Sequence, residues 1–339
     1  MAPDESPRRA APAIPAASTA PEGTPAGVAP PGFRLPAATR VGRVRLQVAD
    51  LDRSIAFYER VLGLRVLERS GDVATMGARG ASSSADGQDR GGGDERGDDA
   101  VLVELHELAG ARPVPRGGRL GLYHFAVLLP DRASLGRFVG HVASQRIAVG
   151  AADHLVSEAL YLHDPDGLGI EVYADRPRAA WRSEGREITM TTAPLDVRDL
   201  AAAGGDAPWR GAPAGTVIGH VHLHVGDLRA SEAFYHEALG LDKVVWSYPG
   251  ALFLSAGGYH HHLGTNVWAP GATRPGADEA RLLEWELVLP DRRSLDAAAH
   301  SLAGGGHDIT RAARGDVVAS DPWGTPLRLV EGARASGAA

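Results

Sequence analysis

The sequence predicts an α+β fold made of four strand–helix–strands units (βαβββ) paired into two domains, and two internal repeats are the observations behind this prediction. Residues 44–58 (VRLQVADLDRSIAFY) match residues 221–235 (VHLHVGDLRASEAFY) in pattern. Residues 128–135 (LLPDRASL) match residues 288–295 (VLPDRRSL) in the same way. Self-similarity of this kind indicates internal duplication. The chain therefore holds four related units in two pairs.

Each unit begins with the pattern of a strand and continues with that of a helix. Residues 44–48 alternate between apolar and polar side chains, which is the period of a half-buried strand. A helical stretch follows at residues 53–61, and either Asp50 or Asp52 can cap its N-terminus. Short strands come after each helix, as at residues 168–173. The order in each unit is strand, helix and then several strands.

The repeats divide the chain into two domains joined by a linker. We expect the first pair of units over residues 39–175 and the second over residues 214–332, with residues 176–213 running over the surface between them. Other segments are rich in Ala and Pro or in Gly, Ser and Asp, which cannot build a packed core. We expect disorder in residues 1–38, 79–99 and 333–339.

Composition excludes several classes of protein. The chain has 339 residues and a formal charge of −7 without a basic block, so we expect no nucleic-acid partner. It has no Cys, so a bound metal must use His and carboxylate ligands. No apolar run approaches the ~20 residues that span a bilayer, and we expect no membrane partner and a cytoplasmic location. Arg8 and Arg9 resemble the start of an export signal, but prolines interrupt the apolar segment that should follow.

The 14 histidines are clustered, and this pattern points to metal chemistry. Three histidines lie at alternating positions in residues 219–225 (GHVHLHV), and three are consecutive at 260–262. His124 follows Tyr123 and His154 follows Asp153 in two other segments. Neutral imidazoles combined with one carboxylate are the ligand set of non-haem Fe(II) oxygenases, which keep coordination positions open.

Five motifs together resemble a known family. The order of units, with His on first strands and Glu on a last strand, resembles the vicinal oxygen chelate superfamily, and more closely its two-domain extradiol dioxygenases of the catechol 2,3-dioxygenase-like branch. The resemblance covers about residues 40–331. The motifs that carry it are residues 121–126 (GLYHFA), 153–157 (DHLVS), 161–171 (YLHDPDGLGIE), 219–225 (GHVHLHV) and 257–262 (GGYHHH).

The resemblance implies that His124, His220 and Glu171 hold the metal. His124 and His220 occupy the first-strand slots of the second and third units, and Glu171 occupies the last-strand slot of the second. The first and fourth units carry other residues in the matching slots: Arg43, Glu284 and Arg328. The second and third units must therefore meet across the site. Relatives of this family instead take all ligands from the third and fourth units.

The resemblance also implies acid/base residues beyond the metal ligands. Tyr161 precedes Glu171 by the spacing of the family's active-site Tyr, and His154 and His261 resemble its acid/base histidines. A neutral imidazole near pH 7 can take and return a proton. His260 and His262 share one face if this run is a strand, with His261 on the other. The sequence leaves open which one faces the site, and His262 is the alternative to His261.

Strand geometry supports a further role for two histidines. His220, His222 and His224 lie on one face of their strand, so His222 or His224 is expected to orient a ligand. Glu171 lies on an otherwise apolar strand, where an unpaired buried charge costs several kcal/mol that a metal would offset.

Together these expectations predict an Fe(II)-dependent extradiol dioxygenase that opens the ring of a small aromatic diol with O2. Mn(II) is the alternative ion. Two other functions use the same scaffold. One is a glyoxalase-like metal-dependent isomerase or lyase, for which Glu104 could supply a fourth ligand. The other is a non-catalytic protein that binds small molecules such as drugs. A homo-oligomer is compatible with the sequence.

Overall fold

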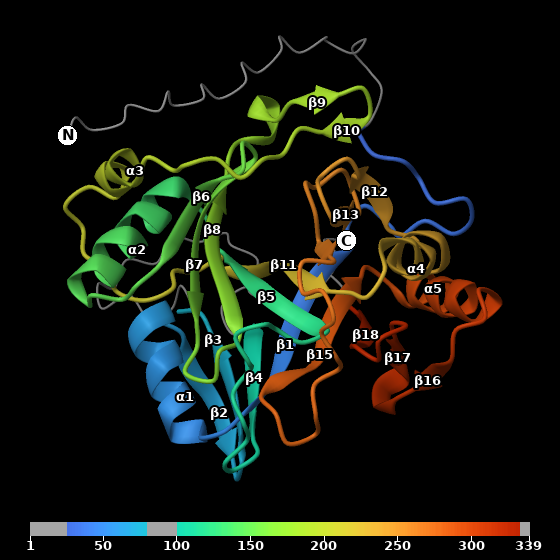
Figure 1. Ribbon diagram of the computed structural model, residues 1–339, viewed down its shortest axis with the longest axis horizontal. Helices are drawn as coiled ribbons and strands as arrows, with labels where there is room; N and C mark the ends of the chain where they lie inside the picture. The colour runs from blue at the N-terminus through green and yellow to red at the C-terminus, as the bar shows by residue number, and fades with distance from the viewer. Residues whose placement is uncertain (1–25, 80–99, 333–339) are drawn as a thin grey trace, which may run out of the picture.

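The computed structural model describes residues 26–79 and 100–332. The disorder expected for residues 1–25, 80–99 and 333–339 therefore falls outside the described residues. Within the described ranges, no helix is both long and apolar enough to cross a membrane. The chain forms two eight-stranded sheets with helices packed against them, which confirms the predicted α+β class (Figure 1).

The inner sheet combines the second and third units. Antiparallel pairing of β5 with β11 joins the two units edge to edge. This confirms that these units meet. In order across the sheet, the strands are β12 (Asp242–Val245), β13 (Ala251–Ser255), β14 (Leu263–Asn266), β11 (Val217–His224), β5 (Gly121–Leu128), β8 (Gly169–Asp175), β7 (Ser157–His163) and β6 (Gly150–Asp153).

The outer sheet combines the first and fourth units through antiparallel pairing of β1 with β15, which lie side by side in Figure 1. Each sheet thus takes one unit from each half of the chain, and the division into domains 39–175 and 214–332 stays a prediction. The strand order is β16 (Ile309–Arg311), β17 (Val317–Ser320), β18 (Pro326–Glu331), β15 (Arg281–Leu289), β1 (Arg40–Val48), β4 (Val101–Glu107), β3 (Val73–Gly77) and β2 (Arg65–Ser70).

An aspartate caps the helix of every unit. In each case its carboxylate accepts a hydrogen bond from the backbone N–H three residues later, which satisfies one of the free donors of the first turn. The sequence left Asp50 and Asp52 as alternative caps of the first helix, and the structure shows that Asp50 is the cap. The helices and their caps are α1 (Leu51–Phe57, Asp50), α2 (Arg132–Ser144, Asp131), α4 (Leu228–Glu232, Asp227) and α5 (Arg292–Gly304, Asp291). α1 and α4 continue as π-helices at Tyr58–Leu62 and Ala233–Ala238.

Two buried tyrosines tie the sheets together. The hydroxyl of Tyr58, from the first unit, donates to Asp164 in the turn between β7 and β8 of the second. The hydroxyl of Tyr235, from the third unit, donates to Asp321 in the matching turn of the fourth. Each aspartate also accepts two backbone N–H groups of its own turn. Burial raises the pKa of Asp164 to about 7.

Residues 26–38, expected to be disordered, are ordered against the third unit. Val28 forms a β-bridge with Lys243, and the guanidinium of Arg34 donates two hydrogen bonds of 2.7 Å to Asp242. Leu35 is only 3% exposed. The prediction from composition was wrong here because a few apolar and charged residues suffice to anchor a segment when a sheet edge offers partners.

The linker also packs more closely than expected. Its helix α3 (Val197–Ala203) lies against α2, and a short hairpin forms from β9 (Ser183–Glu184) and β10 (Glu187–Ile188). Gly136 of α2 permits the contact, because a β-carbon there would lie 2.3 Å from the carbonyl oxygen of Leu200. Residues 189–192, which follow the hairpin, lie next to a cavity in the inner sheet.

The outer sheet carries an ion-pair network at the positions that match the inner histidines. Glu104 of β4 is 5% exposed and contacts Arg43 and Arg45 of β1 at 2.9 Å each. Glu284 of β15 accepts from Arg45 at 3.1 Å and from Arg328 at 2.7 Å. Opposite charges on neighbouring strands therefore satisfy one another in this sheet.

Removal of the Glu104 carboxylate should destabilise the fold. In Glu104→Ala, two arginines lose a buried partner, and we expect the free energy of unfolding to fall by about 2 kcal/mol, measured by urea denaturation. The matched control is Asp278→Ala, whose carboxylate pairs with Arg112 while both side chains are exposed. The control should leave the unfolding midpoint nearly unchanged. Equal losses in the two variants would contradict a structural role for the network.

Candidate metal centre

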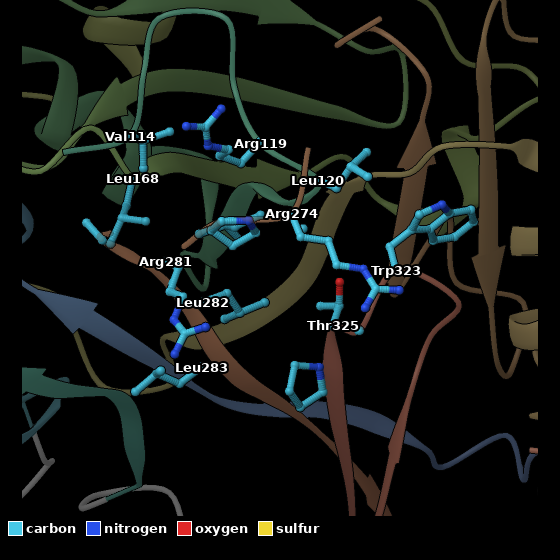
Figure 2. A pocket seen from close by; sticks show the side chains of 16 residues that line it. Val114, Arg119, Leu120, Leu168, Arg274, Arg281, Leu282, Leu283, Trp323 and Thr325 are labelled. Carbon is cyan, nitrogen blue, oxygen red and sulfur yellow. The ribbon is translucent and has the colours of Figure 1, made fainter. Parts of the chain in front are cut away.

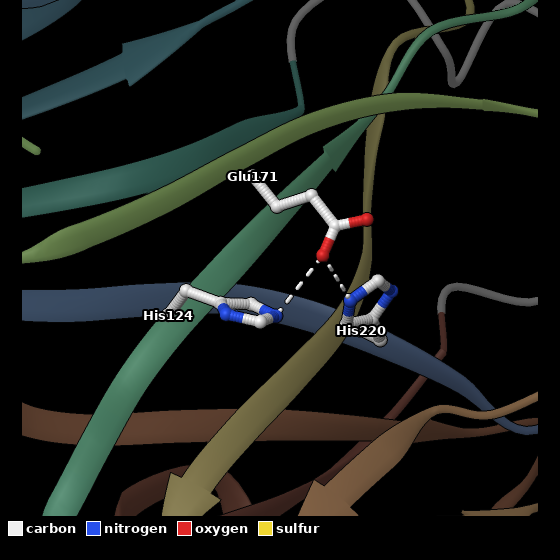
Figure 3. Close-up of side chains that lie close together, drawn as sticks. All are labelled: His124, Glu171 and His220. Atoms are coloured by element: carbon white, nitrogen blue, oxygen red, sulfur yellow. Dashed lines mark hydrogen bonds and ion pairs between the residues drawn. The ribbon is translucent and has the colours of Figure 1, made fainter. Parts of the chain in front are cut away.

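Strand register brings three predicted ligands onto one face of the inner sheet. His124 lies on β5, His220 on β11 and Glu171 on β8. β5 pairs with both other strands, so that Ala126 lies opposite His220 on one side and opposite Glu171 on the other. Directly paired residues point to the same face, and so do residues two positions apart along a strand. The three side chains consequently converge, as Figure 3 shows.

The three ligand atoms are close enough to share one ion. Nε2 of His124 lies 3.0 Å from Oε2 of Glu171, and Nε2 of His220 lies 3.1 Å from the same oxygen (Figure 3). All three ligand atoms lie within 4.8 Å of one another. The side chains are almost completely buried, and in the described part of the chain this is the one group of His and carboxylate residues with such spacing.

The protonation states suit a cation. Burial lowers the pKa of both His124 and His220, against the opposing effect of Glu171, so both rings are neutral near pH 7. Burial opposes ionisation of Glu171, but the two histidines outweigh it and hold the pKa of this carboxyl well below its usual range. Nε2 of both histidines lies next to the same carboxylate oxygen of Glu171. Two neutral imidazole nitrogens and one carboxylate oxygen therefore fit a metal ion.

A cavity of about 300 Å³ opens beside the three residues. Its polar wall contains His124 and Glu171 together with other predicted site residues: His154, Tyr161 and His261. Its remaining wall is largely apolar and includes Met190, Tyr248, Phe253 and Trp268. A second cavity, of about 320 Å³, lies between the two sheets and is lined by Arg119, Arg274 and Arg281 (Figure 2). It contains none of the predicted site residues.

His154 and Tyr161 form a hydrogen-bonded pair in the cavity. Nδ1 of His154 lies 2.6 Å from the carbonyl oxygen of Thr191, which can only accept, so Nδ1 carries the proton. Nε2 then accepts from the Tyr161 hydroxyl, also at 2.6 Å. Tyr161 lies directly opposite Glu171 in the β7–β8 pairing, which explains their spacing in the sequence. Burial raises the pKa of Tyr161 well above its usual value, and Glu171 reinforces the effect.

The three consecutive histidines lie in the loop between β13 and β14 and do not form the expected strand. His261 lines the cavity. Nδ1 of His262 instead accepts from the backbone N–H of Ala256 at 3.2 Å, so the structure does not bring His262 to the cavity. His260 is fully buried behind His261.

The other two histidines of β11, His222 and His224, form no hydrogen bond with the candidate ligands. Nδ1 of His224 lies 2.7 Å from Oδ1 of Asn266. His222 lines the cavity, and its Nε2 has no hydrogen-bond partner among the described residues. The expected orienting role of His222 or His224 is therefore not seen as a hydrogen bond to His124 or His220.

Sequence reasoning missed most of the apolar wall. Met190 and Thr192 come from the linker, and Tyr248, Phe253 and Trp268 come from the third unit, outside the repeated motifs. Single aromatic or Met residues carry no periodic signal, because core residues have the same composition. The clustering of Trp and Tyr in segments outside the repeats was the one sequence signal that could have indicated this wall.

Comparison with known proteins agrees with this fold. The family model described as Glyoxalase/Bleomycin resistance protein/Dioxygenase superfamily matches residues 40–172 and 217–325, so the chain belongs to this family, as the resemblance predicted. The protein named catechol-2,3-dioxygenase from Bacillus subtilis (strain 168) is 42% identical over 275 residues, which cover 80% of this chain and 90% of that protein. This relative bears out the expected enzyme class, an extradiol dioxygenase.

Solved structures support the fold alone. A crystal structure of a candidate dioxygenase from Bacillus subtilis has a TM-score of 0.58 at 14% identity and covers 88% of this chain and 86% of its own. A glyoxalase I variant from Zea mays has a TM-score of 0.50 at 18% identity, covering 87% of this chain and 92% of its own. Proteins with different activities thus share the architecture.

The buried loop histidine predicts a pH dependence of stability. Burial lowers the pKa of His262 to about 3, whereas the unfolded chain has a value of about 6.5. Between these values the unfolded state binds one more proton, so the free energy of unfolding falls as pH drops below about 6.5. The loss is up to about 1.4 kcal/mol per pH unit for this group.

His262→Gln should flatten that slope, because glutamine does not titrate while its oxygen can still accept from the loop. Urea unfolding of the metal-free protein between pH 7.5 and 5 measures it. The control is His300→Gln, since His300 is exposed on α5. A slope in His262→Gln as steep as in the unaltered protein would contradict the assignment.

Proposed function

We propose that this chain is an Fe(II)-dependent extradiol dioxygenase that opens the ring of a catechol-type substrate with O2. The observation that carries the proposal is the convergence of His124, His220 and Glu171 beside a cavity that His124 and Glu171 line. The 42% identical relative named catechol-2,3-dioxygenase supports the substrate class. Mn(II), which suits carboxylate and water ligands, is the alternative ion.

The three side chains would hold the ion from one side. Two imidazole nitrogens and one carboxylate oxygen leave the positions toward the cavity for ligands other than protein. When bound there, the iron supplies a template for the diol oxygens and for O2 and a path for electrons between them. Glu171 offsets part of the positive charge, which a buried site requires.

The neighbouring residues would bind and move protons. The Tyr161 hydroxyl donates its hydrogen to Nε2 of His154, so the lone pairs of the phenol oxygen can accept from a substrate hydroxyl. A proton taken up at this oxygen passes along the same hydrogen bond to His154, whose Nδ1 remains fixed by the carbonyl of Thr191.

The glyoxalase-like alternative lacks its fourth ligand. Glu104, the residue that could supply it, lies in the outer sheet and is held by Arg43, Arg45 and His106. Three protein ligands with open positions favour oxygen chemistry over a fully ligated isomerase site. A site for passive drug binding has no need of the His154–Tyr161 pair, which favours an enzyme.

Loss of a ligand should abolish metal binding. The unaltered protein should bind about one equivalent of Fe(II) in an anaerobic titration. His124→Ala and Glu171→Ala should each weaken binding by more than about 100-fold, because two donors hold a divalent ion poorly. His300→Ala, which removes an exposed histidine, should bind as the unaltered protein does. Full binding by either ligand variant would refute the assignment.

Ring cleavage should follow from loading with iron. Protein reconstituted with Fe(II) without oxygen and then exposed to air should turn a catechol into a yellow product, and protein loaded with Zn(II) should not. Tyr161→Phe should lower kcat by about 100-fold with Fe(II) content unchanged, because the proton path through the phenol is lost. Iron-loaded protein that consumes no O2 with any catechol of a substituted panel would exclude the function.

A further inference from the structure

We propose that Asp175 and His260 are positioning residues that hold His261 in a single tautomer, with Nδ1 protonated and the bare Nε2 available to the cavity. The consequence for catalysis rests on the proposed function, whereas the tautomer itself does not. The two residues lie outside the cavity lining and act through His261.

A short chain of hydrogen bonds connects the cavity to the surface. His261 lines the cavity, and its Nδ1 lies 2.7 Å from Nδ1 of His260. Nε2 of His260 lies 2.8 Å from Oδ1 of Asp175. The side chain of His260 is 0% exposed, whereas that of Asp175 is 27% exposed. Water can therefore reach the carboxylate but not the middle ring.

The chemistry of each group fixes the direction of these bonds. An ionised carboxylate can only accept, so Nε2 of His260 must donate to Asp175. A neutral imidazole has one N–H, which leaves Nδ1 of His260 as an acceptor. The short contact then requires that Nδ1 of His261 donate. The second nitrogen of His261 is left with a lone pair, suited to accept a proton from a substrate hydroxyl.

The surroundings keep the carboxylate and the middle ring in place. The Tyr259 hydroxyl donates to the same oxygen of Asp175 at 3.2 Å, and the Tyr173 hydroxyl lies 2.7 Å from that of Tyr259. The rings of Tyr259 and Trp181 pack against His260 with centroids 4.1 and 5.2 Å away.

Gly219, which precedes the candidate ligand His220, makes room for this arrangement. A β-carbon at position 219 would lie 1.9 Å from the Tyr173 hydroxyl oxygen, so the tyrosine could not hold its place beside a larger residue. The His261 ring itself packs on His220, with centroids 4.1 Å apart. The positioning residues and the candidate metal ligands are therefore packed as one unit.

Nitrogen NMR of metal-free protein labelled with ¹⁵N-histidine tests the tautomer without any catalysis. Bare and protonated ring nitrogens resonate in separate regions, and His261→Gln assigns the signals. We expect a bare Nε2 and a protonated Nδ1 for His261, and a mixture of tautomers in Asp175→Ala. Asp278→Ala, which removes an exposed carboxylate, should leave the spectrum unchanged. A protonated Nε2 of His261 in the unaltered protein would overturn the proposal.

Steady-state kinetics test whether Asp175 affects catalysis through His261. Asp175→Ala should lower kcat by roughly 10-fold with little change in KM, because His261 loses its orientation but the cavity wall does not change. Asp175→Asn should restore most of kcat, since the amide oxygen can still accept from His260. Equal activities of the Ala and Asn variants would refute the role. If the unaltered protein turns over no catechol, the proposed function fails while the NMR result stands.

The cavity walls carry a second inference, which also rests on the proposed function: we infer that the substrate is a catechol with an uncharged, apolar substituent. No Arg or Lys lines this cavity in the described residues, and the one carboxylate there is that of Glu171. Apolar residues such as Met190, Phe253 and Trp268 make up much of the wall. A substrate carboxylate directed at these apolar groups, away from the metal ligands, would lie there without a neighbouring cation, which is costly.

A comparison of substrates tests this inference. The kcat/KM of an alkyl-substituted catechol should exceed that of a dihydroxybenzoate by on the order of 100-fold. Met190→Arg adds a cation and should reduce the ratio of the two kcat/KM values by about 10-fold. The control Met190→Leu adds no charge and should leave this ratio unchanged. A dihydroxybenzoate used as well as the alkylcatechol would overturn the inference, whereas no turnover of either would overturn the proposed function.

Discussion

The pairing of β5 with β11 is the constraint on which the site depends. It joins two units that are far apart in the sequence and sets the register that places His124, His220 and Glu171 on one face. A slip of one residue would turn one histidine to the opposite face, because side chains alternate along a strand. Gly219 lies in the irregular part of this register and admits the Tyr173 hydroxyl beside the centre.

The outer sheet uses the same scaffold to hold ion pairs. Its central pair, β1 and β15, has the same antiparallel arrangement, but Arg and Glu residues replace the histidines. Fixed opposite charges there neutralise one another inside the sheet. In the inner sheet one carboxylate faces two neutral imidazoles, which leaves negative charge and lone pairs for a cation. Duplication thus allowed one sheet to specialise in stability and the other in chemistry.

Much of this arrangement was readable from the sequence because it is local or repeated. Strand alternation, the Asp caps and the duplicated motifs each act over a few residues, and the outer units' lack of a His and Glu set implied that the inner units meet. The loop at 256–262 was read as a strand because three histidines in a row have no turn signature of their own. The two glycines before them have positive φ, which is typical of a turn and not of a strand, and His261 lines the cavity.

The residues that escaped prediction are those whose position depends on the whole fold. Met190 reaches the cavity from a linker, and the carbonyl of Thr191 fixes the tautomer of His154 through its backbone, so no side-chain pattern could reveal it. On the opposite side Asp175 fixes the ring of His260. The candidate ligands thus come from strands of the repeated units, whereas Met190 and Thr191 come from the linker, which the repeats do not share. Divergence in such segments can change the substrate and proton chemistry without disturbing the ligand set.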